Sequence, residues 1–133
     1  MTATATKTTP ATEVEQLIDQ YIAAWNETDP ATRRALIART WTEDGRYLDP
    51  LMSGEGHDGI DAMVDAAQNQ FPGYRFRRTG ELDTHHDRVR FSWELGPEAG
   101  PPLAGGVDFG VVSDGRLHTI TGFLDFAPGA SGE

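Results

Sequence analysis

Three polar residues lie in segments of the sequence that are otherwise apolar, and each comes from a different part of the chain. Tyr21 lies in QYIAAW, Asp49 in RYLDPL and Asp108 in GGVDFGVV. A buried carboxyl costs free energy unless it is protonated, paired or hydrogen-bonded. One ionised aspartate could remove a proton from a ligand as a general base. A second, neutral aspartate beside a tyrosine phenol could stabilise the enolate-like oxygen that results.

Each of these residues also has an ordinary structural explanation. Tyrosine is common on the buried side of an amphipathic helix, with its hydroxyl at the rim. Asp49 precedes Pro50, and aspartate in that position often forms a turn through bonds to nearby amides. Asp108 lies inside a strand-like run, where it would face solvent if the sheet had one wet face. The residues alone leave both explanations open.

The first half of the chain is predicted to be helical. Thr12 and Glu15 have the spacing of a capping box, and an apolar face follows at helical spacing: Val14, Leu17, Ile18, Tyr21, Ile22 and Trp25. Asp29-Pro30 is typical of the start of a second, shorter helix, which is expected to end near Trp41. Asp58 is expected to begin a third helix, which carries Ile60, Met63, Val64 and Ala67.

The second half of the chain is predicted to form strands. After a turn at 42–45, a short extended segment at 46–48 and a loop at 51–57, the period of the apolar residues becomes two from Tyr74 onward. The segments 81–86, 88–95, 103–112 and 117–124 are the expected strands, and Asp114-Gly115 indicates a hairpin. This order predicts an α+β fold with the helices on one face of a curved, mainly antiparallel sheet. A single domain is expected at 12–126, with disordered tails at 1–11 and 127–133.

Composition excludes several classes of function. The net charge of −10 disfavours binding to nucleic acid or to anionic membranes. The chain has no cysteine and no apolar run of the ~18 residues that a membrane span needs, which is typical of a cytoplasmic protein. His85 and His86 are adjacent, so on a strand they point to opposite faces and do not favour a shared metal ion. No metal and no cofactor is therefore expected.

The order of motifs resembles that of a known superfamily. The motifs are QYIAAWNETD, WTEDGRYLDP, GHDGI and DGRLHTITGFLD, and they extend over residues 12–126. They are similar to those of the SnoaL-like branch of the nuclear-transport-factor-two-like superfamily, and of ketosteroid isomerase within it. The resemblance implies a cone-shaped α+β barrel, commonly dimeric, with a pocket for a small hydrophobic ligand. It also implies that Asp49 is the general base and that Tyr21 and Asp108 form the oxyanion hole.

The chain departs from the isomerase pattern at two places. Val64 stands where the third helix of the isomerase supplies a supporting tyrosine, and Leu124 stands where the last strand supplies a bulky aromatic residue. The resemblance implies that both residues line the pocket, with Trp25 and His118, and that a steroid is a poor fit.

Other activities of the superfamily make different demands on the site. Gly106 stands in place of the arginine of limonene-type epoxide hydrolases, which argues against that activity. Dehydratase-like chemistry requires histidines in the pocket, and His118 is the candidate. A polyketide cyclase needs an aspartate base, for which Asp49 and Asp125 are candidates.

These observations favour an enzyme that needs no cofactor. It would act on a small hydrophobic carbonyl compound by removing a proton and stabilising the enolate, as in ketosteroid isomerases or polyketide cyclases. The alternative from another class is a noncatalytic domain that binds a small molecule or mediates dimerisation. In that case the same three groups only line a pocket.

Overall fold

The computed structural model describes residues 10–127. Residues 1–9 and 128–133, which make up most of the two predicted tails, lie outside the described residues, and Ala11 already belongs to the first helix. The chain forms three helices: α1 (Ala11–Asn26), α2 (Pro30–Thr40) and α3 (Gly56–Gln70). It also forms six strands: β1 (Trp41–Leu48), β2 (Ser53–Glu55), β3 (Arg75–His85), β4 (Arg88–Gly96), β5 (Ala104–Ser113) and β6 (Arg116–Phe126).

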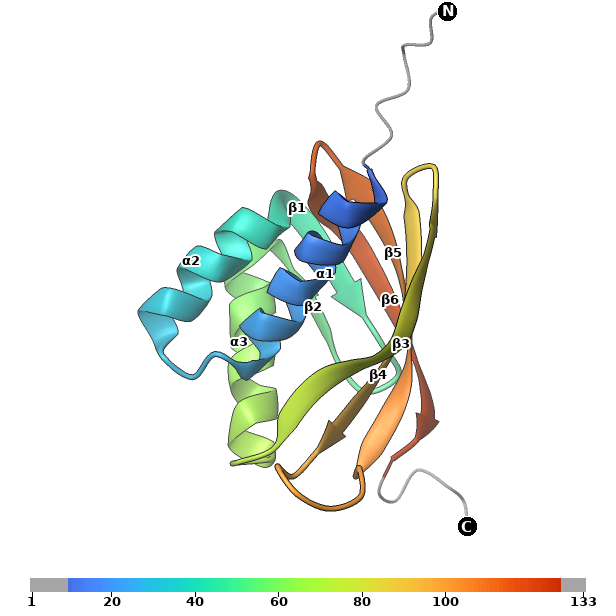
Figure 1. Ribbon diagram of the computed structural model, residues 1–133. Coiled ribbons are helices and arrows are strands. Elements are labelled where there is room, and N and C mark those ends of the chain that lie inside the picture. Colours follow the sequence, from blue (N-terminus) through green and yellow to red (C-terminus); the bar gives the residue numbers. More distant parts are fainter. Residues whose placement is uncertain (1–9, 128–133) are drawn as a thin grey trace, which may run out of the picture.

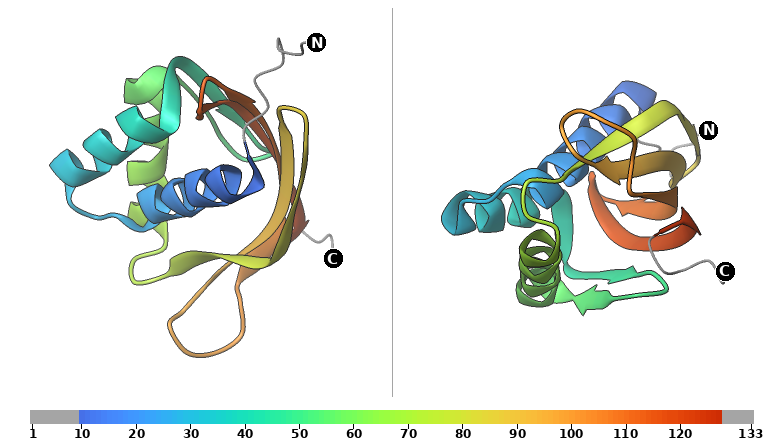
Figure 2. Two further views of the ribbon diagram at one scale, coloured as in Figure 1. Left: turned by 45° about the horizontal axis from the view of Figure 1, so that its top comes forward. Right: turned by 90° about the horizontal axis from the view of Figure 1, so that it is seen from below.

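The six strands form one curved sheet, and the helices cover one of its faces (Figures 1 and 2). The strand order is β2-β1-β6-β5-β4-β3, so β2 and β3 are the two edges and the sheet stays open. All neighbouring strands are antiparallel except β1 and β6, which are parallel. The predicted α+β class, with helices on one face of a curved and mainly antiparallel sheet, is confirmed.

Local sequence signals explain several of the element boundaries. The predicted apolar face of α1 is buried, with Tyr21 on it. The side chain of Asp29 accepts a hydrogen bond from the backbone N–H of Thr32, and Pro30 occupies the first turn of α2, as predicted. Asp114 and Gly115 both have positive φ, 53° and 81°, which is the conformation that a two-residue hairpin of this type requires.

Four local predictions were wrong. Asp58 was expected to begin the third helix, but α3 begins at Gly56, so Asp58 lies inside its first turn. The helix α1 begins at Ala11, so Thr12 lies inside it and forms no capping box; no side chain caps this end. Residues 42–45, predicted as a turn, belong to β1, where the pairing with β6 shifts register between Trp41 and Arg46. The strand β2 was taken for a loop, because three residues are too few to show a period of two. Its pairing with β1 is a tertiary contact.

A buried arginine joins α2 to α3. Arg33 is 2% exposed; its Nε lies 2.7 Å from an oxygen of Asp61, and its Nη1 lies 3.0 Å from Gln68. A buried charge is tolerated only when it is paired and hydrogen-bonded, so these contacts set the position of α3 relative to α2. The helix α3 is in turn one wall of the cavity described below.

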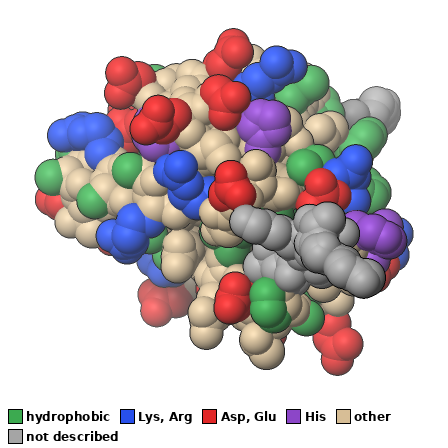
Figure 3. Space-filling model, turned by 90° about the horizontal axis from the view of Figure 1, so that it is seen from above, with side chains coloured by type: hydrophobic (Ala, Val, Ile, Leu, Met, Phe, Trp, Pro, Cys, Tyr) green, Lys and Arg blue, Asp and Glu red, His purple; other side chains and the backbone are tan. Residues whose placement is uncertain are grey.

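The surface carries charges of both signs. On the face shown in Figure 3, Arg side chains are interspersed with Asp and Glu side chains. The chain has a net charge of −10. None of the helices at residues 10–127 has the length and apolar character that crossing a membrane demands.

Candidate active site

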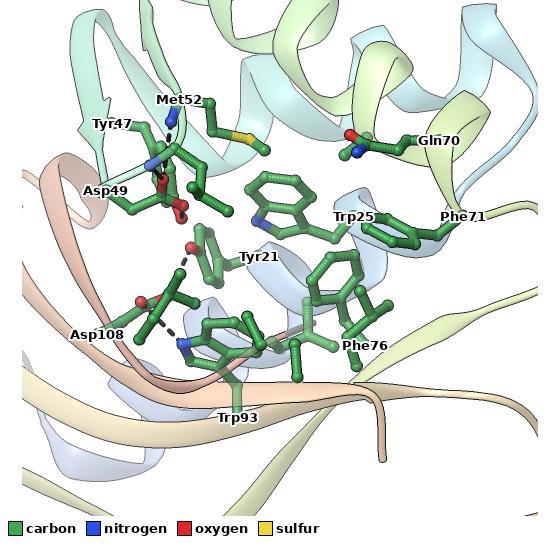
Figure 4. A pocket seen from close by; sticks show the side chains of 17 residues that line it. Tyr21, Trp25, Tyr47, Asp49, Met52, Gln70, Phe71, Phe76, Trp93 and Asp108 are labelled. Atoms are coloured by element: carbon green, nitrogen blue, oxygen red, sulfur yellow. Dashed lines mark hydrogen bonds between the residues drawn. The ribbon is translucent and has the colours of Figure 1, made fainter. Parts of the chain in front are cut away.

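A cavity of about 400 Å³ lies between the inner face of the sheet and the helices α1 and α3, within the range of small-molecule sites. Its wall is mostly aromatic and aliphatic. The lining residues are Tyr21, Ile22, Trp25, Tyr47, Asp49, Leu51, Met52, Ala67, Gln70, Phe71, Phe76, Trp93, Leu95, Ala104, Asp108, Leu124 and Ala127. In Figure 4, the two aspartates lie together at one side of the cavity, while Phe71, Phe76 and Gln70 lie at the other.

Tyr21 and Asp108 meet at the polar side. The Tyr21 hydroxyl, from α1, donates to Oδ2 of Asp108, from β5, at 2.8 Å (Figure 4). Both residues are only 2% exposed. The indole Nε1–H of Trp93, from β4, donates to the other oxygen of Asp108 at 3.1 Å. Both oxygens of this buried carboxyl therefore have a hydrogen-bond partner.

The environment of Asp108 favours its neutral form. Burial raises the pKa of Asp108 to about 7; the Tyr21 and Trp93 hydrogen bonds oppose the rise, and the nearby charge of Asp49 adds to it. Burial, together with the neighbouring Asp108, also raises the pKa of the Tyr21 phenol well above its usual value. Near pH 7, Asp108 is therefore present in both protonation states, while Tyr21 keeps its hydrogen.

Asp49 lies in the turn that follows β1 and is half-buried. Its Oδ1 accepts hydrogen bonds from the backbone N–H groups of Leu51 and Met52, at 2.8 and 2.9 Å. Its Oδ2 accepts a hydrogen bond from the Tyr47 hydroxyl at 2.5 Å. These contacts hold the carboxylate in one orientation at the cavity wall. The turn former and the candidate base are thus the same residue, and one explanation does not exclude the other.

Gly122 on β6 is what allows the two aspartates to be neighbours. A Cβ at this position would lie 2.8 Å from Oδ1 of Asp108, 3.2 Å from Cβ of Asp49 and 3.3 Å from the Tyr47 hydroxyl. The three side chains therefore surround the space that a larger residue would fill. The site depends on glycine here for room, since Gly122 has no positive φ to accommodate.

We expect Gly122→Ala to lower the free energy of unfolding by about 1–3 kcal/mol, because overpacking of this kind forces neighbouring groups apart. Urea unfolding measures the loss. Gly59→Ala is the matched control, since a Cβ there meets only ordinary contacts at 3.7 Å and beyond. Equal stability of the two variants would show that the space above Gly122 is not tight.

The structure places some of the other predicted residues at the cavity and some away from it. Trp25 and Leu124 line the cavity, but Val64 and His118 do not. Val64 is 2% exposed and packs in the main core, because it lies one turn before Ala67, where α3 reaches the cavity. His118 is partly exposed, with Nε2 at 3.6 Å from Asp44. The pairing of β5 with β6 shifts register at this residue, which breaks the alternation that would have turned His118 inward.

Two further residues of the site were not predicted as functional: Tyr47 and Trp93. Tyr47 lies two positions before Asp49, so the alternation of a strand could have placed both side chains on one face. Trp93 is a buried aromatic residue, and burial alone gives no reason to expect a functional role. The pairing of Phe91 with Asp108 puts Trp93 diagonally across from Asp108 on the same face of the sheet, and that pairing is not visible in the sequence.

Metal ligands do not gather at this site or at the histidine pair. Among residues 10–127, no group of three or more His, Asp or Glu side chains is placed to hold a metal ion. Asp83 forms an ion pair with Arg90 at 2.7 Å, and Asp87 forms one with Arg88 at 2.6 Å. These contacts account for the acidic residues around His85 and His86.

Comparison with known proteins agrees with the geometry. The model of the SnoaL-like domain matches residues 18–119. A candidate isomerase of the SnoaL-like family from Agrobacterium tumefaciens is 46% identical, with a TM-score of 0.82 over 86% of this chain and 99% of that chain. The comparison with curated proteins finds no match.

More distant solved structures share the fold. A candidate SnoaL-like polyketide cyclase from Jannaschia is 18% identical, with a TM-score of 0.70 over 88% of this chain and 89% of that chain. A candidate ketosteroid isomerase from Kribbella flavida is 22% identical, with a TM-score of 0.66 over 92% of this chain and 82% of that chain. At these identities, the likeness concerns the fold alone.

Proposed function

The chain belongs to the SnoaL-like family, and from this premise we propose that it is an enzyme that needs no cofactor and enolises a small hydrophobic carbonyl compound. One observation carries the proposal. Asp49 and Asp108, which are 59 positions apart in the sequence, open into the same apolar cavity, where Asp108 is bonded to the Tyr21 hydroxyl. A cavity that only binds a hydrophobic ligand has no need of two carboxyls at one end.

In the proposed reaction, the carbonyl oxygen of the substrate lies near Tyr21 and Asp108. The ionised Asp49 accepts a proton from the carbon next to the carbonyl. The electron pair of the broken C–H bond forms the enolate, and its charge on oxygen is stabilised by hydrogen-bond donors at the Tyr21–Asp108 end. If Asp49 returns the proton to another carbon, the outcome is isomerisation. If the enolate carbon attacks a second carbonyl of the same molecule, the ring closes, and the alkoxide that forms takes the proton back from Asp49.

The charges of the cavity favour a neutral substrate. Among the described residues that line it, the ionisable side chains are two phenols and two carboxyls, namely Tyr21, Tyr47, Asp49 and Asp108. A carboxylate or phosphate on the substrate would lie near Asp49 without a cation to pair with, which costs free energy in a largely apolar site. The aromatic residues Trp25, Phe71 and Phe76 provide flat contact surface for a ring system.

The proposal is tested by proton exchange in deuterated water. A neutral bicyclic ketone such as 2-tetralone, incubated with the protein, is expected to take up deuterium next to its carbonyl faster than in buffer, as measured by NMR. The carboxylate-bearing analogue of the same ketone serves as the comparison and is expected to react more slowly. Tight binding of neutral ketones without any exchange above the buffer rate would instead support a noncatalytic ligand-binding domain.

We also propose that two copies of the chain associate through the outer face of the sheet. Asp108 and Gly122 face the cavity, so Phe109 and Phe123, one position further along, face outward. They are 44% and 51% exposed, and their rings pack edge to face, with the ring centres 5.8 Å apart. Beside them Arg90 pairs with Asp83, so this face is locally neutral. In a chain with a net charge of −10, a neutral apolar face is one on which two copies repel each other little.

Phe123→Glu is expected to convert the protein to a monomer, because the new carboxylate lies opposite Val107 and would be buried unpaired against the second copy. Sedimentation equilibrium measures the mass in solution. Ala66→Glu is the matched control: it adds the same charge at an exposed position of α3 and should leave the dimer intact. A monomeric parent protein, or equal masses of the two variants, would contradict the proposal.

A further inference from the structure

The two oxygens of Asp108 have partners of different chemistry. Oδ1 faces the indole Nε1–H of Trp93 at 3.1 Å, and Oδ2 faces the Tyr21 hydroxyl at 2.8 Å. An indole N–H only donates, whereas a phenol both donates and accepts. Oδ1 is therefore an acceptor whenever the Trp93 bond is made, and the contact between Oδ2 and Tyr21 can run in either direction.

This difference decides which oxygen carries the proton when Asp108 is neutral. The carbonyl oxygen of a carboxylic acid accepts hydrogen bonds, and the hydroxyl oxygen donates one. The Trp93 N–H holds Oδ1 in the accepting role, so the acid proton lies on Oδ2, whose hydrogen-bond partner is the Tyr21 oxygen at 2.8 Å. Tyr21 then accepts from Asp108, and the hydrogen of its own hydroxyl is free for a ligand in the cavity.

When Asp108 is ionised, the same contact is reversed. Both carboxylate oxygens are then acceptors, and the Tyr21 hydroxyl donates to Oδ2. The hydrogen that a ligand oxygen would need is therefore engaged within the protein. The protonation state of Asp108 thus controls whether Tyr21 can act on a ligand.

We infer that Trp93 is a positioning residue: it places the proton of neutral Asp108 on Oδ2, and this arrangement makes Tyr21, with Asp108 behind it, the donor that reaches a ligand oxygen. The placement of the proton follows from the geometry alone. That Tyr21 donates to a ketone oxygen rests on the proposed function. It refines that function, because Asp108 then acts on the ligand through Tyr21.

The groups that face Asp108 are few, which makes its titration simple to interpret. Among the described residues, the titratable ones are Tyr21 from α1, Tyr47 from β1 and Asp49 from the turn after β1. From β4 the contact is Trp93, and from β6 it is Gly122; neither titrates. Burial raises the pKa of Tyr47 far above its usual range, so Asp49 is the one neighbour that brings a charge near neutral pH.

The first test follows the indole N–H signal of Trp93 and the carboxyl ¹³C signal of Asp108 by NMR across pH. In the parent protein, both signals are expected to move together, with a midpoint near 7. In Trp93→Phe, the Asp108 midpoint should rise by about one pH unit, because a donor that favours the ionised form is lost. Trp41→Phe, which removes a buried indole that does not line the cavity, should leave the midpoint in place.

An Asp108 midpoint that stays or falls in Trp93→Phe would overturn the inference. If that variant does not fold, the titration of the parent protein is the test. An indole signal of Trp93 that does not follow the Asp108 titration would also overturn the inference. The second test is the affinity for 2-tetralone on either side of the Asp108 midpoint. We expect tighter binding below the midpoint in the parent protein and no pH dependence in Tyr21→Phe.

A pH dependence that persists in Tyr21→Phe would show that Asp108 itself is the donor to the ligand, which contradicts the inference. The outcomes also separate this inference from the proposed function. If the ketone neither binds nor exchanges, the proposed function fails, whereas the NMR titrations still decide where the proton of Asp108 lies and what Trp93 does.

Discussion

Asp49→Asn should lower kcat/KM for proton exchange from a ketone by about 10²- to 10⁴-fold, the usual contribution of a general base. An amide cannot accept the proton, yet its oxygen can still accept the two backbone hydrogen bonds from Leu51 and Met52 that hold the turn. The variant is therefore expected to fold as the parent does. NMR of deuterium uptake gives the rate, and thermal unfolding checks the fold.

Asp125→Asn provides the matched control for this prediction. Asp125 is the other aspartate considered as a base; it lies on β6, is exposed and does not line the cavity. Its replacement should leave the exchange rate unchanged. Equal rates for the parent protein and Asp49→Asn would remove Asp49 as the base, and a loss confined to Asp125→Asn would transfer that role to Asp125.

The second large effect concerns stability against pH. The pKa of Asp108 is raised to about 7 in the folded protein, whereas an aspartate in an unfolded chain titrates near 3.9. Below about pH 3, the carboxyl is neutral in both states. As the pH rises from there to about 7, the unfolded chain loses this proton first and gains stability relative to the folded protein. The parent protein should therefore lose on the order of 4 kcal/mol relative to Asp108→Asn over this window.

Urea unfolding of both proteins at several pH values between 4 and 8 measures this difference. The comparison with Asp108→Asn cancels the other carboxyl groups, since both proteins contain them. The asparagine is also a suitable neutral partner, because its oxygen can accept from Trp93 while its amide donates toward Tyr21. A difference in stability that stays flat between pH 4 and 8 would show that Asp108 is not held neutral in the fold.

Much of the fold was predictable because its signals are local. The apolar face of α1, the Asp29-Pro30 start of α2 and the Asp114-Gly115 turn each depend on residues within a few positions of one another. Where a contact between distant segments decides the local structure, the predictions were wrong. The strand β2 forms by pairing with β1, and residues 42–45 belong to β1, which pairs with β6 on its other side.

For the candidate site too, local signals were predictable and contacts between distant segments were not. Tyr21, Asp49 and Asp108 were identified because a polar residue in an apolar segment is visible in the sequence. Val64 and His118 were misjudged, and the contact of Trp93 with Asp108 was missed, because the register of the sheet and the position of a residue along α3 decide which side chains reach the cavity. One extra residue in β6 between the partners of Val111 and Val112 is enough to keep His118 out.

The sequence by itself determined most of the elements, the family and the chemical types at three positions of the site. Only the tertiary structure decided that Asp108 is bonded by Tyr21 and Trp93 at once, and that Gly122 leaves room for Asp49 beside it. The physical reason is that pKa values and hydrogen-bond directions depend on burial and on contacts across tens of residues. A linear pattern states which groups are present, and the packing of the sheet against the helices determines what they can do.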